Sequence, residues 1–346
     1  MLATALLAGP AAAPLCAEAA TRRVLAMGTI FDVTVCLPRR EEALAAAEKA
    51  VAEVARMEDV LTTWREGGPL DQINRAPAGQ PVAVDSGLFA LLREVFDWSA
   101  RTRGAFDPTV LPLVRAWDLR GEGRIASEAE LAPAREATGT DRFRLDAAGR
   151  AVARLDGRAG IDEGAWGKGY ALDRAAESLR GAGVSGALLD LGGEVLALGR
   201  SPEGTAWTVS IADPRRRRRP ILRLALPAGF AVSTSGDSER MRRVGGRAIG
   251  HLLDPRTGSP APDFGSASVV CPSGLVADVL STAFFVLGPE AGLELSEQLR
   301  QEGVSNEALF LVVRGSRLQA LSSPGFRDLV LSSDPDCVTG LPRAGS

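Results

Sequence analysis

The predicted strands of this chain come in adjacent pairs that stand between helices, and this order constrains the fold more than any other feature. Pairs of short apolar runs around turn residues occupy residues 143–155, 187–197, 207–226 and 308–321. Adjacent strands joined by short turns form antiparallel hairpins, whereas parallel βαβ units need a helix between successive strands. The sequence therefore predicts an α+β fold with mixed or antiparallel sheets and packed helices, and not a doubly wound parallel sheet.

Helical periodicity marks the segments between these hairpins. Residues 41–61 place apolar side chains at steps of three and four, which gives one apolar helical face. A strand at residues 29–37 precedes this helix, and Ser127 with Glu130 predicts a capping box at the start of another. The remaining helices are expected over residues 88–99, 127–137, 169–180, 275–287 and 290–302. These elements fill residues 21–331, which we expect to form one domain, followed by a loose tail at 332–346.

Composition argues against two classes of partner. The formal net charge is −3, which does not suggest nucleic acid, and no run is long and apolar enough to span a bilayer. The arginine run at residues 215–219 is interpreted as a solvated loop between two prolines. The four cysteines lie far apart and show no metal-ligand spacing.

The first 20 residues are apolar and rich in alanine, like the hydrophobic region of a secretory signal. They lack the basic residues that open such a signal, so a disordered tail is the alternative. We expect export, with the signal-like segment preceding the folded domain.

The only histidine of the chain, His251, lies in the segment A-I-G-H-L-L-D-P-R-T-G-S-P at residues 248–260. A lone histidine on a short apolar segment is often a satisfied core residue, and that alternative stays open. The functional interpretation gains weight because two other segments have the chemistry of a metal site and of a phosphate-binding turn. Together they suggest an enzyme that acts on a phosphorylated ligand.

The phosphate-binding candidate is the segment G-I-D-E-G-A-W-G-K-G-Y-A-L-D at residues 160–173. Its glycines surround Lys168, and a helix follows at once. Glycines let the backbone approach a ligand, and a helix N-terminus offers free N–H groups to an anion. The spacing is not that of a P-loop, so a tight turn with an exposed lysine is the alternative.

The metal candidate lies in the apolar helix at residues 275–287. Asp278 and Thr282 are four residues apart and so share one face of that helix. A buried carboxylate needs a partner, and a carboxylate with a hydroxyl oxygen suits a hard cation such as Mg²⁺. The alternative is a helix-internal hydrogen bond of Thr282, with Asp278 near the N-terminus.

Three further segments combine polar residues with turn chemistry. They are Asp190 before a double glycine, Asp107-Pro108-Thr109, and the Ser/Thr/Gly-rich residues 231–240. Each is open to a plain structural interpretation as a turn, a helix cap or a loop.

In this order, the segments resemble the FAD:protein FMN transferase (ApbE) family from about residue 27 to residue 310. The shared motifs are M-G-T at 27–29, G-x-F-D-P-T at 104–109, G-K-G-Y-A-x-D at 167–173, D-L-G-G-E at 190–194, S-T-S-G-D at 233–237, H-x-x-D-P-R-T-G at 251–258 and A-D-x-x-S-T-A at 277–283. The resemblance implies an ApbE-like α+β fold that uses FAD as substrate and Mg²⁺ as cofactor. It implies transfer of FMN to a threonine of an acceptor flavoprotein, such as a subunit of a respiratory or redox complex, with release of AMP. It also implies a periplasmic or cell-envelope location, which agrees with the signal-like start.

The resemblance assigns residues to two sites. The metal ligands would be the backbone carbonyl of Ala165 and the side chains of Asp278 and Thr282. The residues that match the FAD site are Met27, Trp64, Asp107, Lys168 and His251.

This chain also departs from the family pattern at four places, and one is the segment Arg-Glu-Gly-Gly-Pro-Leu after Trp64, which lacks the usual Asp-Ser. Gly250 replaces the first of two consecutive histidines, Glu163 replaces a usually apolar residue, and Trp166 is bulkier than the usual residue. These departures concern the shape of the flavin pocket and not the metal site.

His251 is the expected general base that takes the proton of the acceptor hydroxyl. Two alternatives use the same residues. One is a metal-dependent FAD pyrophosphatase that gives FMN and AMP, and the other is a non-catalytic flavin-binding protein.

Overall fold

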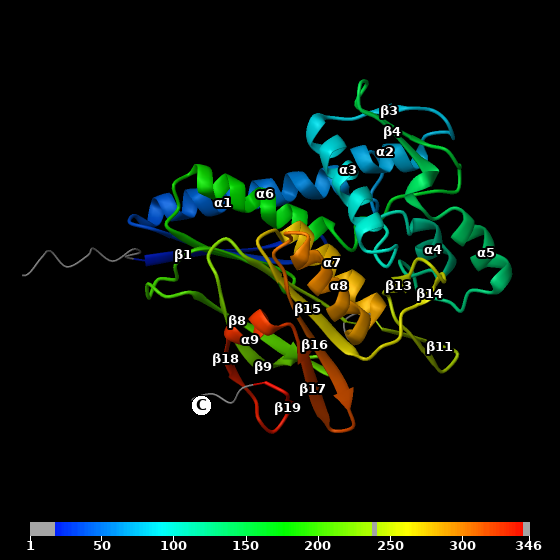
Figure 1. Ribbon diagram of the computed structural model, residues 1–346. Helices are drawn as coiled ribbons and strands as arrows, with labels where there is room; N and C mark the ends of the chain where they lie inside the picture. Colours follow the sequence, from blue (N-terminus) through cyan, green and yellow to red (C-terminus); the bar gives the residue numbers. More distant parts are fainter. Residues whose placement is uncertain (1–17, 237–240, 342–346) are drawn as a thin grey trace, which may run out of the picture.

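A nine-stranded sheet runs through the centre of the molecule, within residues 18–236 and 241–341, which the computed structural model describes (Figure 1). Its order is β1-β2-β6-β7-β10-β15-β16-β17-β19, and all neighbours are antiparallel except β17 and β19. The strands are β1 (Glu18–Ala26), β2 (Thr29–Leu37), β6 (Gly186–Leu191), β7 (Glu194–Gly199), β10 (Ala231–Ser235), β15 (Gly265–Cys271), β16 (Glu307–Arg314), β17 (Arg317–Ser322) and β19 (Val338–Thr339).

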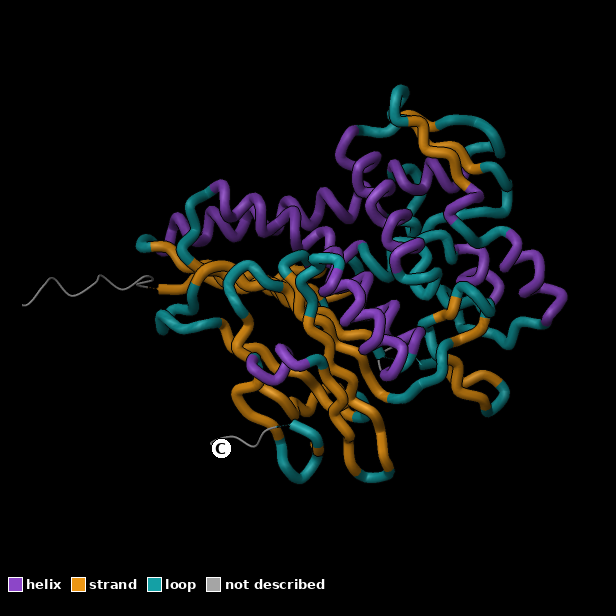
Figure 2. Tube along the Cα trace, in the orientation of Figure 1, coloured by secondary structure: helices purple, strands orange, loops and turns teal. Residues whose placement is uncertain are grey.

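The two faces of this sheet bury two separate apolar cores. In β15, Val269 belongs to the core beneath the helices, whereas its neighbour Val270 belongs to the core on the opposite face. This alternation follows from the period of two of a strand. Helices α1 (Arg40–Leu61), α6 (Gly167–Gly181), α7 (Gly274–Leu287) and α8 (Pro289–Gln301) cover the first face (Figure 2). The second core is closed by the sheet of β8 (Trp207–Asp213), β9 (Arg216–Leu226) and β18 (Val330–Ser333) and by α9 (Pro324–Asp328).

A smaller lobe packs at one end of the large sheet (Figure 1). It contains α2 (Pro69–Arg75), α3 (Ser86–Arg101), α4 (Leu111–Ala116) and α5 (Glu128–Glu136), with the sheet of β3 (Val82–Ala83), β4 (Phe143–Asp146) and β5 (Ala151–Arg154). Two short hairpins complete it, β11 (Arg242–Val244) with β12 (Arg247–Ile249) and β13 (Leu253–Asp254) with β14 (Ser259–Pro260). Ile249 and Leu253 share a core with Leu113 and Leu131, so the segment around His251 is fastened to α4 and α5. None of the described helices is long and apolar enough to cross a membrane.

The predicted α+β class and antiparallel pairing are confirmed. The predicted capping box also forms, because Glu130 accepts from the Ser127 N–H at 2.8 Å. Two predictions are wrong. Residues 216–219 of the arginine run belong to strand β9, because that strand continues past Pro220 to the turn at Pro214 and Arg215.

The other error concerns the chain after residue 331. Strands β18 and β19 pair with β9 and β17, and Cys337 and Val338 are buried in the second core, so the described part of the expected tail is ordered. The signal-like residues 1–17 and the last residues, 342–346, lie outside the described residues. Residues 18–20, which were also expected to belong to that segment, form the start of β1.

Helices α6 and α7 cross at two glycines, Gly169 and Gly274. A Cβ atom on Gly169 would lie 2.1 Å from the carbonyl oxygen of Gly274 and 2.8 Å from Cβ of Asp278. The start of α7 is held by Asp173 of α6, which accepts from the N–H groups of Gly274 and Leu275 at 2.7 and 2.9 Å. The glycines therefore bring the two helix backbones into contact at the level of Asp278.

Gly169→Ala is expected to destabilise the protein by about 1–3 kcal/mol, because the added methyl group must push the two helices apart. Gly181→Ala is the matched control, since a Cβ atom at this last residue of the same helix meets nothing within 4 Å. Urea unfolding followed by circular dichroism measures both. Equal stabilities for the two variants would contradict the close crossing.

Candidate active site

Two adjoining cavities lie where α6, α7 and the smaller lobe meet the sheet. The larger measures about 670 Å³ and the smaller about 220 Å³. Gly28, Gly164, Lys168 and His251 line both, so the two cavities form one continuous site.

The predicted residues divide between these cavities. Met27 and Trp64 line the larger, whereas Asp278 and Thr282 line the smaller. Lys168 and His251 stand where the cavities join, so six of the predicted side chains meet in one place.

Met27 and Gly28 form the two-residue turn of the β1–β2 hairpin. Both have positive φ, 49° and 71°, as the preferred tight hairpin turn requires. Methionine adopts this region at a cost, and the Met27 N–H is held by the Glu58 carboxylate at 2.8 Å. The turn thereby brings the M-G-T motif to the cavity wall.

Lys168 lies in the first turn of α6 and forms an ion pair with Glu194, the first residue of β7. Glu194 is buried and also lines the smaller cavity. The D-L-G-G-E motif therefore contributes its last residue to the site, whereas the sequence interpretation singled out only its Asp190 and glycines.

Asp278 is the buried carboxylate of the smaller cavity. Its Oδ2 accepts from the Gly169 N–H at 3.1 Å, across the helix crossing. Burial raises the pKa of Asp278, and the positive charge of Lys168 opposes that shift. A carboxylate in this environment is stabilised by any further cation that enters the cavity.

Thr282 lies one turn along α7, and its Oγ1 is 3.3 Å from Oγ of Ser235. Ser235 also contacts Ser281 at 2.9 Å, so a row of hydroxyl groups continues from the cavity into the protein. The S-T-S-G-D motif supplies Ser235 at the end of β10, while its Asp237 lies outside the described residues.

The donors that face the smaller cavity suit a hard divalent cation. A carboxylate and a hydroxyl group are oxygen ligands, and Mg²⁺ commonly completes its shell with water and substrate phosphates. No three His, Cys, Asp or Glu side chains gather as a metal cluster in the part of the chain that the structure describes. Ala165, the expected backbone ligand, is half-buried and follows Gly164, which lines both cavities.

His251 directly precedes the β13–β14 hairpin, which the D-P-R-T-G motif builds. Asp254 accepts from the Arg256 backbone N–H at 2.9 Å, and Gly258 turns the chain with φ of 75°. The indole N–H of Trp117 donates to the Gly258 carbonyl at 2.8 Å. The motif thus fixes the backbone after His251 against the smaller lobe, and His251 faces the cavities instead of lying in the core.

Asp107 takes a different role from the other predicted residues. Its carboxylate accepts from the backbone N–H and the hydroxyl of Thr109 at 2.7 and 2.6 Å, and burial raises its pKa. It is not one of the residues that line either cavity. Here the structure shows the turn that the sequence left as the alternative.

Comparison with known proteins gives the same picture. The model of the ApbE family matches residues 27–305. The chain belongs to the ApbE family.

Relatives in this family carry the name FAD:protein FMN transferase. The protein from Treponema pallidum is 32% identical over 309 residues, covering 84% of each chain. The one from Klebsiella pneumoniae is 29% identical over 312 residues, covering 88% of this chain and 87% of its own length.

Solved structures of ApbE proteins have the same fold. The ApbE protein of Thermotoga maritima matches with a TM-score of 0.82 and 29% identity, over 90% of this chain and 99% of its own. The apo flavinyl transferase ApbE of Pseudomonas stutzeri matches with a TM-score of 0.77 and 29% identity, over 90% of this chain and 96% of its own.

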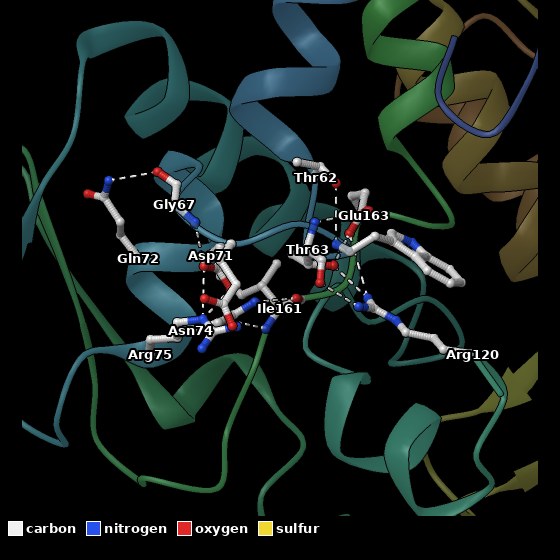
Figure 3. A network of polar contacts seen from close by, with 12 residues as sticks. Thr62, Thr63, Gly67, Asp71, Gln72, Asn74, Arg75, Arg120, Ile161 and Glu163 are labelled. Carbon is white, nitrogen blue, oxygen red and sulfur yellow. Dashed lines mark hydrogen bonds and ion pairs between the residues drawn. The ribbon is translucent and has the colours of Figure 1, made fainter. Parts of the chain in front are cut away.

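The departure of this ApbE-family chain at Glu163 builds a polar network under the larger cavity (Figure 3). The buried Glu163 carboxylate accepts from the hydroxyl and the backbone N–H of Thr63, and Arg120 donates to the Thr63 carbonyl at 2.7 Å. Arg120 also pairs with Asp162 and lies over the ring of Trp64, 4.7 Å from its centroid. Trp64 is 61% exposed, so Arg120 is a main support of this ring at the cavity wall.

Arg120 could not be identified from the sequence, because it lies in a loop with no motif and meets Thr63 only through the fold. Glu58 was missed for a similar reason, since it stands on the polar side of a long amphipathic helix. Glu194 could have been found, because it is a charged residue at the start of an otherwise apolar strand.

Burial raises the pKa of Glu163 to about 7, and the neighbouring Asp162 adds to that shift. The folded protein therefore holds the proton more tightly than the unfolded chain, and stability falls as pH rises from about 4.5 to about 7. Glu163→Gln cannot ionise and should escape this loss. We expect the variant to gain on the order of 2 kcal/mol relative to the wild type between pH 5 and pH 8.5. Urea unfolding at both pH values measures it, and a difference that does not change with pH would contradict the assignment.

Proposed function

We propose that this enzyme is an FAD:protein FMN transferase, which moves FMN from FAD to a threonine hydroxyl of an acceptor flavoprotein and releases AMP. The supporting observation is the meeting of Asp278, Thr282, Lys168 and His251 in one small polar cavity that opens into a larger, mostly apolar one. A small polar cavity beside a larger apolar one suits a substrate with a flat ring system at one end and a pyrophosphate in the middle. The names of the relatives support the same activity.

Asp278, Thr282 and the Ala165 carbonyl would hold Mg²⁺. When bound, such an ion neutralises charge on the pyrophosphate oxygens and on the leaving AMP. Lys168 would hold a phosphate oxygen, helped by the N–H groups at the start of α6. Trp64 and Met27 would pack on the flavin in the larger cavity.

In the transfer step, the threonine oxygen attacks the phosphorus of the FMN half of FAD. A new P–O bond forms, the P–O bond to the AMP half breaks, and AMP leaves with the bridging oxygen. The hydroxyl proton passes to His251, which lines both cavities. Water in place of the threonine would give FMN and AMP.

Substitution of Thr282 tests the cation site. Thr282→Val keeps the shape but removes the oxygen, and should raise the Mg²⁺ concentration needed for half-maximal transfer by about 10–100-fold. Thr282→Ser keeps the oxygen and is the matched control, expected to stay near the wild type. The assay follows the mass gain of an acceptor flavoprotein domain incubated with FAD and Mg²⁺. Equal Mg²⁺ requirements in the two variants would remove Thr282 from the ligands, and free FMN and AMP without labelling would favour the pyrophosphatase.

Replacement of the imidazole tests the proposed base. His251→Ala should lower the transfer rate by about 10²–10⁴-fold, the range of a general base. FAD binding, measured by quenching of flavin fluorescence, should change much less because the remaining cavity wall is intact. Full transfer activity in the variant would exclude His251 as the base.

A further inference from the structure

We propose that the acceptor protein docks on the tip of the β1–β2 hairpin and the arginine-rich part of β9, and that it presents apolar and acidic residues beside its reacting threonine. This inference rests on the proposed function. We call this area the docking surface and define it by Leu25, Ile30, Arg216, Arg217 and Arg218.

The smaller cavity has a buried side and an exposed side. Asp278 and Thr282 form the buried side, and both are less than a tenth exposed. Gly28, Gly192 and Arg217 line it from chain segments at the surface, namely the β1–β2 turn, the β6–β7 turn and β9. With the flavin in the larger cavity, an acceptor hydroxyl can approach the phosphorus from this exposed side.

The hairpin tip presents two apolar side chains to solvent beside the cavity. Leu25 is 86% exposed and its cross-strand partner Ile30 is 46% exposed. They flank the Met27-Gly28 turn, on the face of the hairpin opposite to the one that packs under α1. Exposed apolar side chains at the mouth of a site are typical of a surface that a partner covers.

A bulge in β9 brings Arg217 to the same place. Asp213 pairs with Arg216 and Ala212 pairs with Pro220, so residues 217–219 stand outside the ladder with β8. Bulges of this kind redirect side chains and are common beside active sites. Arg217 donates from Nη2 to the Gly192 carbonyl at 3.2 Å and so reaches the wall of the smaller cavity.

Gly192 joins the apolar and the basic parts of the docking surface. Its N–H donates to the Ile30 carbonyl at 3.0 Å, and its own carbonyl accepts from Arg217. Asp190 lies two residues before Gly192, and its carboxylate interacts electrostatically with both Arg217 of β9 and Arg23 of the hairpin. The hairpin tip and the bulge are therefore one continuous surface.

The chemistry of this surface defines its partner. The arginine run places five positive charges in a row on a chain whose net charge is −3, and ion pairs with Asp213 and Asp334 hold Arg215 and Arg219. Arg216 and Arg218 are exposed. An acidic partner would be steered to this local positive field, and an apolar residue would cover Leu25 and Ile30.

Two variants and two controls test the docking surface. Arg216→Glu/Arg218→Glu should raise the KM for an acceptor domain that the Klebsiella pneumoniae relative labels by at least tenfold at low ionic strength. The difference in KM between this variant and the wild type should shrink in about 0.5 M NaCl, because salt screens exposed charges. Leu25→Ser/Ile30→Thr should raise the KM by about fivefold with little dependence on salt.

The matched controls are Arg93→Glu/Arg144→Glu and Leu155→Ser, which change exposed residues of the smaller lobe. They should leave the KM within twofold of the wild type, and all four variants should bind FAD as the wild type does. Docking-surface variants that label the acceptor as well as these controls would overturn the inference. A wild-type protein that binds FAD and labels no acceptor would instead refute the proposed function.

Peptide acceptors give a second readout that a folding defect would not produce. Peptides with one threonine flanked by aspartates, serines or lysines should be labelled in that order of kcat/KM by the wild type. Arg216→Glu/Arg218→Glu should lose or reverse the order. An order that is the same in both proteins would overturn the inference.

Discussion

The close crossing of α6 and α7 is the contact on which the site depends. Gly169 and Gly274 let the two backbones touch, and the Gly169 N–H then reaches the buried carboxylate of Asp278. Lys168 precedes Gly169, so the same crossing sets the lysine and the carboxylate on the wall of one cavity. A carboxylate this buried needs a positive neighbour, and the fold provides a lysine beside it and room for a cation.

The other walls of the site are mostly turns, held in place by elements far away in the sequence. The Met27-Gly28 turn is held by Glu58 of α1, and the segment after His251 is held by Trp117 of the smaller lobe. Such turns bring backbone groups to a substrate while the sheet and the helices stay rigid. This arrangement explains why most of the shared motifs combine glycine with aspartate.

The sequence predicted those features that depend on local chemistry. The hairpin at residues 187–197, the capping box at Ser127 and the shared face of Asp278 and Thr282 all follow from spacing and turn residues. It could not predict contacts that only the fold creates, such as Arg120 over Trp64. The arginine run shows the limit most clearly, because its composition is that of a solvated loop, whereas Arg216 pairs with Asp213 of β8 and residues 216–219 are the first part of strand β9.

Asp107 shows a further limit of prediction from sequence. A motif can be present because it forms a turn and not because it binds a ligand. The Asp107 carboxylate accepts a hydrogen bond from the Thr109 hydroxyl, and the hydroxyl oxygen in turn accepts from the Gly139 N–H at 2.7 Å. A short turn residue and a ligand look alike in a sequence, and only the direction of the side chain separates them. The family resemblance could place the segment but could not supply that direction.

The central claim is that one site holds the flavin in the larger cavity and the pyrophosphate with a divalent cation in the smaller one. A crystal structure of the protein with FAD and Mn²⁺, using the anomalous signal of the metal, tests it most directly. The account predicts one Mn²⁺ peak bonded to oxygens of Asp278 and Thr282, with the flavin ring against Trp64. A metal peak elsewhere, or FAD bound away from Lys168 and His251, would contradict it.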